Sequence, residues 1–197
     1  MANPDRPNGF TPVRTRGSNS WNGLTRRYEA ADRTADTTNN HGDIYVGDPV
    51  ALSSGKVIAA NSAAAVIGVC VGVGKGPSVN GGIGPYNPAN LNSPNYAPLT
   101  DATGWYIWVA PAENTLFQIQ SASDLDLVTG APADINLVAA TAHGSRVTGL
   151  SDVELTTASD NDVLVVEILN AEDNDPTLAN TRYIVQFREI TFAQAAT

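Results

Sequence analysis

Apolar and polar positions alternate most clearly over residues 43–73. Successive side chains of an extended chain point to opposite faces, so this alternation predicts half-buried strands. Residues 47–49, Gly-Asp-Pro, interrupt the first strand, and because proline cannot donate a ladder hydrogen bond, the strand is expected to bend, bulge or lie at an edge. Residues 53–55 predict a tight turn, and residues 56–60 a returning strand. The apolar positions expected to share one face are Ile44, Val46, Val50 and Leu52.

Another strand is expected within residues 64–73, where two kinds of residue alternate. The odd positions are apolar, whereas Gly68, Cys70 and Gly72 occupy even positions. We expect one face to fill a core and the small face to allow close approach of a second backbone. The single cysteine, Cys70, excludes an internal disulfide and is interpreted as a small buried apolar side chain.

Four later segments also predict strands. Residues 105–110 are apolar on both faces, which is typical of a central strand. Residues 116–121 alternate, and residues 111–115 are expected to join the two strands as a hairpin connection. Residues 163–169 and 182–192 predict the last strands. In the final one we expect Tyr183, Val185 and Phe187 to face the core, and Arg182, Gln186 and Arg188 to point outward.

Two further segments are less regular. Residues 132–142 fit either a short helix or a strand around residues 135–138. Residues 147–155 contain a turn at residues 148–149 and a short strand at residues 153–155. The chain therefore has many short strands punctuated by Gly, Pro and Asn and almost no helical periodicity. This pattern predicts an all-β protein, either a β-barrel or a β-sandwich.

The apolar residues of residues 1–42 follow neither the helical nor the strand period, so we expect an extended N-terminal arm. Residues 43–197 are expected to form a single barrel or sandwich domain. Ordering an arm costs about 1–2 kcal/mol of backbone entropy per residue, which calls for burial on the scale of a protein interface. The alternative is that the arm folds back across its own sheet. Residues 74–104, rich in Gly, Pro and Asn, predict a long contact loop.

The charge of the chain is uneven. Residues 1–28 contain five arginines and one acidic residue, for a charge of +4, while the remainder contains 6 basic and 19 acidic residues, for a charge of −13. An acidic body argues against a nucleic-acid-binding domain. We expect the basic arm to contact a protein surface, with a polyanion or a merely solvated tail as alternatives.

The hydrophobic content of 42% is enough for a folded core, and no apolar run approaches the ~20 residues of a membrane span. Residues 1–10 contain no apolar signal core. A soluble protein without a secretion signal or a membrane partner is therefore expected.

Two segments superficially match nucleotide-binding and hydrolase motifs. Residues 72–76, GVGKG, lack the first glycine and the Ser or Thr of a phosphate loop. Residues 149–153, GLSDV, lack the final glycine of a nucleophile elbow. The two histidines, His41 and His143, lie in polar loops and supply neither a zinc site nor a catalytic triad.

Acidic residues offer the remaining candidate chemistry. Within residues 171–176, the carboxylates Glu172, Asp173 and Asp175 could hold calcium, although their spacing is not that of an EF-hand and a solvated turn is favoured. Asp124 and Asp126 could pair with them for glycoside cleavage, but no pattern of sugar-stacking aromatics accompanies them. We therefore expect no enzyme activity, no metal and no cofactor.

Five blocks of the sequence carry a resemblance to a known family. They are MANPDRPNGFTPV, DIYVGDPVAL, WYIWVAPAENTLFQIQ, VTGLSDVEL and LVVEILNAEDND. Together they resemble a family of tailed-bacteriophage virion proteins, and the GDPV hairpin followed by AAVIGV looks like the β-barrel of phage head decoration, or cement, proteins. The resemblance implies a protein that binds the outer surface of the capsid shell at capsomer junctions, often as a homotrimer, and that has no catalytic residues.

The partners implied are the major capsid protein and sister copies of the chain, on the outside of a virion assembled in the host cytoplasm. A tail or host-adhesion module is the alternative, and a polysaccharide depolymerase is a third hypothesis. From the residues, the expected arm anchors are Phe10, Arg14, Trp21, Arg26, Arg27 and Tyr28, with Tyr86 and Tyr96 as contacts in the long loop.

Overall fold

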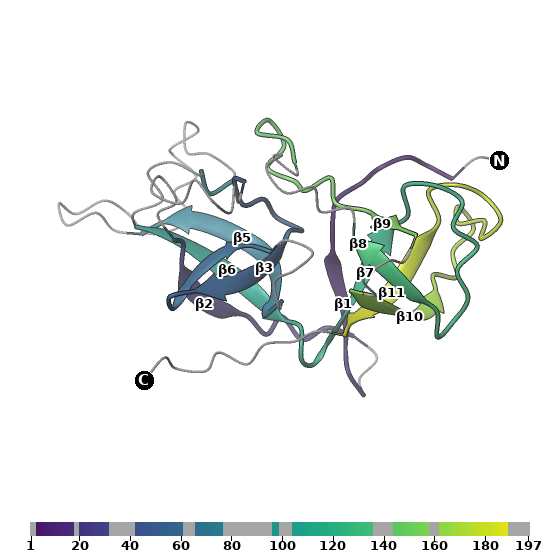
Figure 1. The fold of residues 1–197 in the computed structure, drawn as a ribbon, viewed down its shortest axis with the longest axis horizontal. Coiled ribbons are helices and arrows are strands. Elements are labelled where there is room, and N and C mark those ends of the chain that lie inside the picture. Colours follow the sequence, from purple (N-terminus) through teal and green to yellow (C-terminus); the bar gives the residue numbers. More distant parts are fainter. Residues whose placement is uncertain are drawn as a thin grey trace.

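The computed structural model describes residues 3–17, 20–31, 42–60, 66–76, 96–98, 104–135, 144–157 and 162–188. These residues form eleven strands and no helix, so the predicted all-β class is confirmed. The strands make two antiparallel sheets that lie side by side in the two halves of the molecule (Figure 1).

The first sheet has five strands, and β5 is its central strand. In spatial order the strands are β2 (Arg26–Glu29), β6 (Trp105–Pro111), β5 (Gly68–Lys75), β3 (Pro49–Ser53) and β4 (Lys56–Ala59). β6 pairs with β2 on one edge and β5 on the other, so it is an interior strand, as its apolar sequence predicted, but Tyr106 and Trp108 on one of its faces stay partly exposed. The turn between β3 and β4 is the predicted one, with Ser54 and Gly55 at φ values of 50° and 78°.

The two ends of this sheet approach each other without closing a barrel. Ala30, after β2, forms a parallel bridge with Val57 of β4, and the Ala31 N–H donates to the Val57 carbonyl at 2.9 Å. One face of the sheet packs around its own cluster of buried side chains. This cluster contains Ile44 and Val50, which were predicted to share one face. The expected barrel is therefore not formed, whereas the two-sheet arrangement fits a sandwich.

The second sheet has six strands and carries the aromatic core. In spatial order they are β1 (Thr11–Thr15), β7 (Thr115–Gln120), β11 (Arg182–Phe187), β10 (Val163–Ile168), β8 (Pro132–Ile135) and β9 (Leu155–Thr156). The side chains of Tyr183, Val185 and Phe187 are buried, as the alternation predicted. The ambiguous segment at residues 132–142 begins as a strand, β8.

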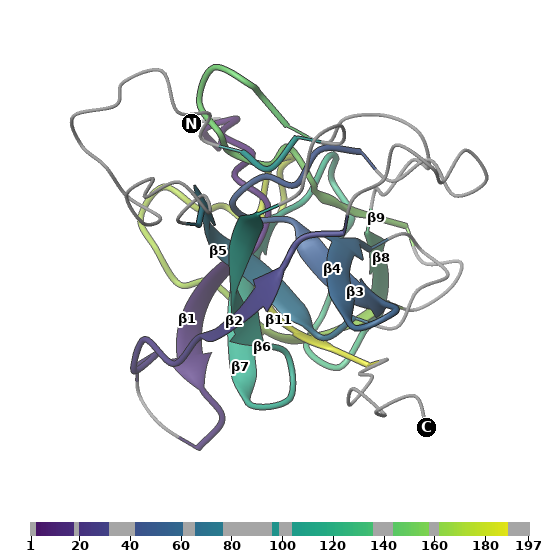
Figure 2. The ribbon, with the colours of Figure 1, turned by 90° about the vertical axis from the view of Figure 1, so that its left-hand side faces the viewer.

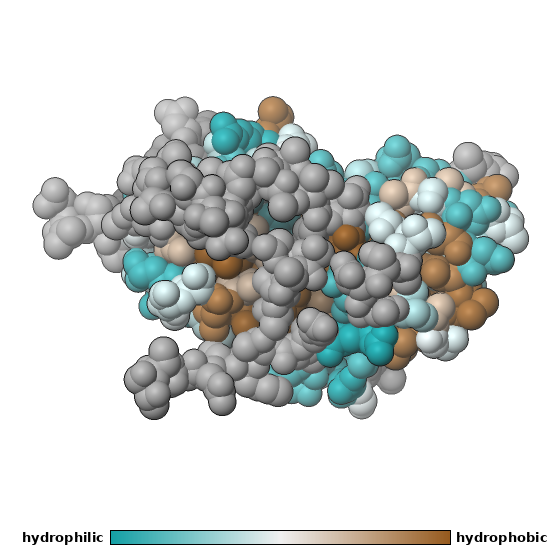
Figure 3. Space-filling model, viewed as in Figure 1, coloured by the Kyte–Doolittle hydropathy of each residue, from teal (hydrophilic) through white to brown (hydrophobic). Residues whose placement is uncertain are grey.

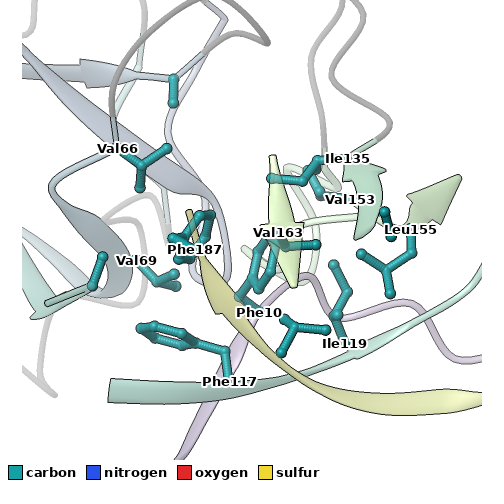
Figure 4. Close-up of a cluster of buried hydrophobic side chains, with 14 of the residues drawn as sticks. Phe10, Val66, Val69, Phe117, Ile119, Ile135, Val153, Leu155, Val163 and Phe187 are labelled. Atoms are coloured by element: carbon teal, nitrogen blue, oxygen red, sulfur yellow. The ribbon is translucent and has the colours of Figure 1, made fainter. Parts of the chain in front are cut away.

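A second cluster joins the two sheets. The Phe10 ring lies 6.1 Å from Phe117 and 4.8 Å from Phe187 between ring centroids. Val69 of β5 and Val66, which precedes β5, belong to the same cluster (Figure 4). Burying one such ring contributes on the order of 1.5–3 kcal/mol. The sheets are therefore held together by apolar side chains contributed from both.

Two predictions about connections and faces are wrong. Residues 112–114 do not close a hairpin, because β6 and β7 belong to different sheets and the turn carries the chain from one to the other. In β5, a register shift between Cys70 and Gly72 breaks the alternation. Consequently Val69 and Val71 pack in the cluster between the sheets, whereas Val73, predicted to share their face, packs against the other cluster.

The extended arm is also corrected over its described residues. β1 pairs with β7, and β2 pairs with β6, so the N-terminal segment supplies an edge strand to each sheet. Phe10 is buried and Trp21 partly buried within the chain itself, as the alternative of folding back proposed. Residues 32–41 of the arm, and residues 77–95 and 99–103 of the long loop, lie outside the described residues.

Candidate partner-binding surface

Several of the expected arm anchors are engaged inside the chain. Phe10 is only 2% exposed and lies in the core. The Arg14 guanidinium donates two hydrogen bonds to Glu167, at 2.7 and 3.2 Å, and this carboxylate raises the pKa of Arg14. Arg26 pairs with Glu113 at 2.5 Å. Phe10 is therefore part of the core, whereas Arg14 and Arg26 have partners within the chain but keep side chains that are 36% and 51% exposed.

Tyr28 and Tyr96 also have intramolecular roles. Tyr28 packs, partly buried, against the cluster of the five-stranded sheet. The Tyr96 ring stacks on Tyr45 with 5.4 Å between centroids, and Arg146 lies over the Tyr96 ring at 5.4 Å. Tyr86 lies outside the described residues.

The segment around Tyr45 is held by a buried carboxylate. Asp43 accepts a hydrogen bond from the Tyr45 hydroxyl at 3.2 Å and one from Arg146 Nε at 2.8 Å. Burial, and then the nearby Asp43 charge, raise the pKa of Tyr45 to about 12. The cluster thus ties the turn at residues 146–148 to the segment before β3.

Trp21 lines a cleft of about 310 Å³ between β1 and β5. Its walls are mostly apolar and consist of Asn8, Phe10, Thr11, Pro12, Trp21, Val46, Cys70, Val71 and Leu150. The Trp21 indole Nε1 is buried and has no hydrogen-bond partner among the described residues. Leu150, on the wall, is 37% exposed. The cleft is close to the lower size limit of ligand sites in proteins.

Arg26 and Arg27 are both exposed, and Arg27 lies beside two aromatic rings of β6. Its guanidinium carbon sits 4.8 Å from the centre of the Tyr106 ring. In the register of β2 and β6, Arg27 lies opposite Trp108, and the two strands run side by side in Figure 2. We call Arg27, Tyr106 and Trp108 the aromatic platform.

The platform lies on the face of β6 that its own cluster does not use. Trp105, Ile107 and Val109 point into the cluster of the five-stranded sheet. The intervening rings, Tyr106 and Trp108, therefore point to the opposite face and are partly exposed. Farther along this face, Ala110 packs into the cluster between the sheets. The platform is the part of this face that the six-stranded sheet leaves uncovered.

Glycines in β5 and directly after it allow the rings to lie close to the sheet. Gly72 is opposite Trp108, and a Cβ built there would lie 3.7 Å from Trp108 Cε3. A Cβ at Gly76 would lie 2.1 Å from Tyr106 Cε2, so a side chain there would displace the ring. The rings are thus held in place by the shape of the neighbouring strand.

Sequence reasoning missed Tyr106 and Trp108 as candidate contacts, because both were assigned to a central strand buried on both faces. The small residues on one face of β5 could have indicated that large side chains of a neighbouring strand lie over that face. Close approach of a second backbone occurs at Gly68, where a Cβ would lie 2.2 Å from the Ala110 carbonyl oxygen. At Gly72, two positions on, the small residue faces the Trp108 ring.

The acidic loop forms hydrogen bonds and an ion pair within the chain. Asp173 pairs with Arg182, and Asn174 accepts from the Arg182 N–H at 2.7 Å. The Thr177 N–H donates to Asp175 and lowers the pKa of that carboxyl. Over the described ranges there is no group of three or more His, Cys, Asp or Glu side chains placed to hold a metal.

Apolar side chains also remain at the surface. Figure 3 shows brown patches between polar residues on both halves of the molecule. Val147 is 87% exposed, Val128 63% and Leu24 50%. No helix among the described residues is long and apolar enough to cross a membrane.

Comparison with protein-family models, with curated proteins and with solved structures finds no match in any of the three. The candidate surface is therefore defined by its residues and geometry. Aromatic rings beside an arginine are the residue types that dominate binding energy in protein interfaces.

Proposed function

We propose that this chain is a structural protein of a bacteriophage virion that binds the outer surface of the capsid shell at capsomer junctions. The structural observation that carries a binding role is the aromatic platform, where Arg27, Tyr106 and Trp108 share one open face of an acidic, all-β body. The five sequence blocks that resemble phage head decoration proteins supply the partner, the major capsid protein.

The mechanism is reinforcement by added interface. Packaged DNA pushes the shell outward, and shell subunits separate along their seams. A molecule that contacts two capsomers adds contact area that must be broken before a seam opens, and specific interfaces bury about 1,200–2,000 Å². A homotrimer repeats each contact, so the contacts gain avidity.

The test is sedimentation of purified protein with phage heads that lack it. We expect the wild-type chain to sediment with the heads, and Arg27→Glu to weaken binding at least tenfold because it reverses the charge of the platform. Arg6→Glu is the matched control, since Arg6 is also exposed but lies beside the six-stranded sheet, where its N–H donates to Gln120 of β7. Failure of the wild-type chain to bind such heads would overturn the proposal.

Copy number separates this proposal from the tail or host-adhesion alternative. A decoration protein is expected at a number of copies comparable to that of the major shell protein. A few copies for each virion would instead favour a tail or adhesion module. Quantitative mass spectrometry of purified virions makes this measurement.

A further inference from the structure

The aromatic platform and the cleft form one continuous surface along β5. Gly72 lies opposite Trp108, and the preceding residue, Val71, lines the cleft. Val71 packs against the cluster between the sheets, on the same face as Trp108. A ligand that crosses Trp108 therefore arrives at the cleft mouth next to Val71.

The charge on this surface is concentrated at Arg27. The neighbouring cations are already paired, since Arg26 bonds Glu113 at 2.5 Å and Lys56 bonds Glu29 at 2.8 Å. Arg27 contacts the Tyr106 ring and has no carboxylate partner among the described residues. A stacked guanidinium keeps its N–H edge available, and two parallel N–H groups match the two oxygens of a carboxylate.

The cleft suits an apolar side chain, unlike Arg27, which suits a carboxylate. Its walls are mostly apolar, and its volume of about 310 Å³ is small for a complete ligand. It suits a large apolar side chain, whose burial stabilises binding by about 1.5–3 kcal/mol. Trp21 and Val71, which both line the cleft, would contact that side chain.

The spacing of the two sites follows from the sheet. Arg27, Trp108 and Gly72 occupy three neighbouring strands in register. Strands lie about 4.8 Å apart, so Arg27 and Gly72 are separated by about 10 Å. An extended chain advances about 3.3 Å per residue, and three residues cover that distance.

We propose that this surface binds an extended segment of a partner protein, with a carboxylate on Arg27 and a large apolar side chain, three residues away, in the cleft. The intervening backbone lies across Trp108. This inference rests on the proposed function for the identity of the partner, which would be a surface segment of the shell protein, but the recognition chemistry is tested without any shell.

The probe is a synthetic tetrapeptide, acetyl-Glu-Ser-Ser-Phe-amide, titrated into the full chain labelled with ¹⁵N. We expect saturable shifts of the Trp108 and Trp21 indole N–H signals and of the Arg27 Nε–H signal. The peptide acetyl-Gln-Ser-Ser-Phe-amide removes only the charge and is expected to bind at least tenfold more weakly. In Arg27→Gln the two peptides are expected to bind alike.

A second variant tests the cleft. Leu150→Trp places a larger side chain on the cleft wall at an exposed position, so the fold should tolerate it. We expect the shift of Trp21 to be lost while the shift of Arg27 is weakened only. Equal binding of the two peptides to the wild-type chain, or no saturable shift at Trp108 and Trp21, would overturn the inference.

The two proposals fail in different ways. If heads bind the chain but neither peptide does, the recognition motif is wrong and the proposed function stands. If the Glu peptide binds selectively but heads do not, the surface chemistry is right and the shell is the wrong partner.

Discussion

Asn3 and Asp175 exchange hydrogen bonds in both directions although 171 residues separate them in the sequence. Asn3 Nδ2 donates to the Asp175 carbonyl at 2.8 Å, and the Asp175 N–H donates to Asn3 Oδ1 at 2.7 Å. Asn3 Nδ2 also bonds the Ala179 carbonyl at 3.0 Å. The Asn3 amide thus acts like a piece of backbone that fastens the N-terminal segment to the connection between β10 and β11.

Replacing this side chain is expected to destabilise the whole fold. Asn3 is 6% exposed, and Asn3→Ala removes its hydrogen bonds to Asp175 and Ala179. We expect a loss of about 1–3 kcal/mol in the free energy of unfolding, measured by urea denaturation. Asn8→Ala, at an exposed position of the same segment, is the control. Equal stability of the two variants would show that the Asn3 contacts contribute nothing.

Phe10 is expected to be among the most sensitive positions of the N-terminal segment. Its ring fills the space between Phe117 and Phe187, and truncation to alanine leaves a cavity in the cluster that joins the sheets. Phe10→Ala should lower the free energy of unfolding by about 3–5 kcal/mol. Leu24→Ala, 50% exposed, should change it by less than about 0.5 kcal/mol. If Phe10→Ala left the free energy of unfolding unchanged, the N-terminal segment would be an arm that the fold does not need.

Two glycines of β5 are expected to respond differently to the same substitution. A Cβ at Gly68 would lie 2.2 Å from the Ala110 carbonyl oxygen, which is backbone and cannot move aside cheaply. Gly68→Ala should therefore cost about 1–3 kcal/mol through overpacking. At Gly72 the nearest atom is 3.7 Å away, an ordinary contact, so Gly72→Ala should cost less than about 1 kcal/mol. Thermal unfolding of both variants makes the comparison.

The ionisation of Tyr45 should lower the stability of the folded state at alkaline pH. Its pKa is raised from 10.0 to about 12 because the buried phenol loses its hydration and faces Asp43. The folded state therefore holds the proton more tightly than the unfolded state, so the associated stability is present below pH 10 and is lost as the pH rises toward about 12.

Tyr45→Phe removes this ionisation and should reduce the fall in stability between about pH 9 and about pH 11. At neutral pH the variant should lose about 1 kcal/mol with the hydrogen bond to Asp43. Urea unfolding at both pH values gives the change in the free energy of unfolding with pH for each protein. Identical slopes for the variant and the wild-type chain would exclude Tyr45 as the cause. Tyr183, whose pKa is also raised by burial, stays in place in both proteins.

The sequence alone determined the features that depend on local order. Alternation placed Ile44 and Val50 on one face and Tyr183 and Phe187 on a core face, and all four are buried, because the side-chain period of a strand is two whatever its neighbours are. The turn at Ser54 and Gly55 followed from residue types that accept positive φ angles.

The tertiary structure decided which strands pair and which faces stay open. Period two fixes the faces of a strand but not its hydrogen-bonding neighbours, so nothing local showed that β1 pairs with β7 or that β6 and β7 lie in different sheets. Likewise, Trp108 is open because the six-stranded sheet covers only the Ala110 end of that face. Such coverage depends on contacts between residues far apart in the chain, which no single stretch of sequence contains.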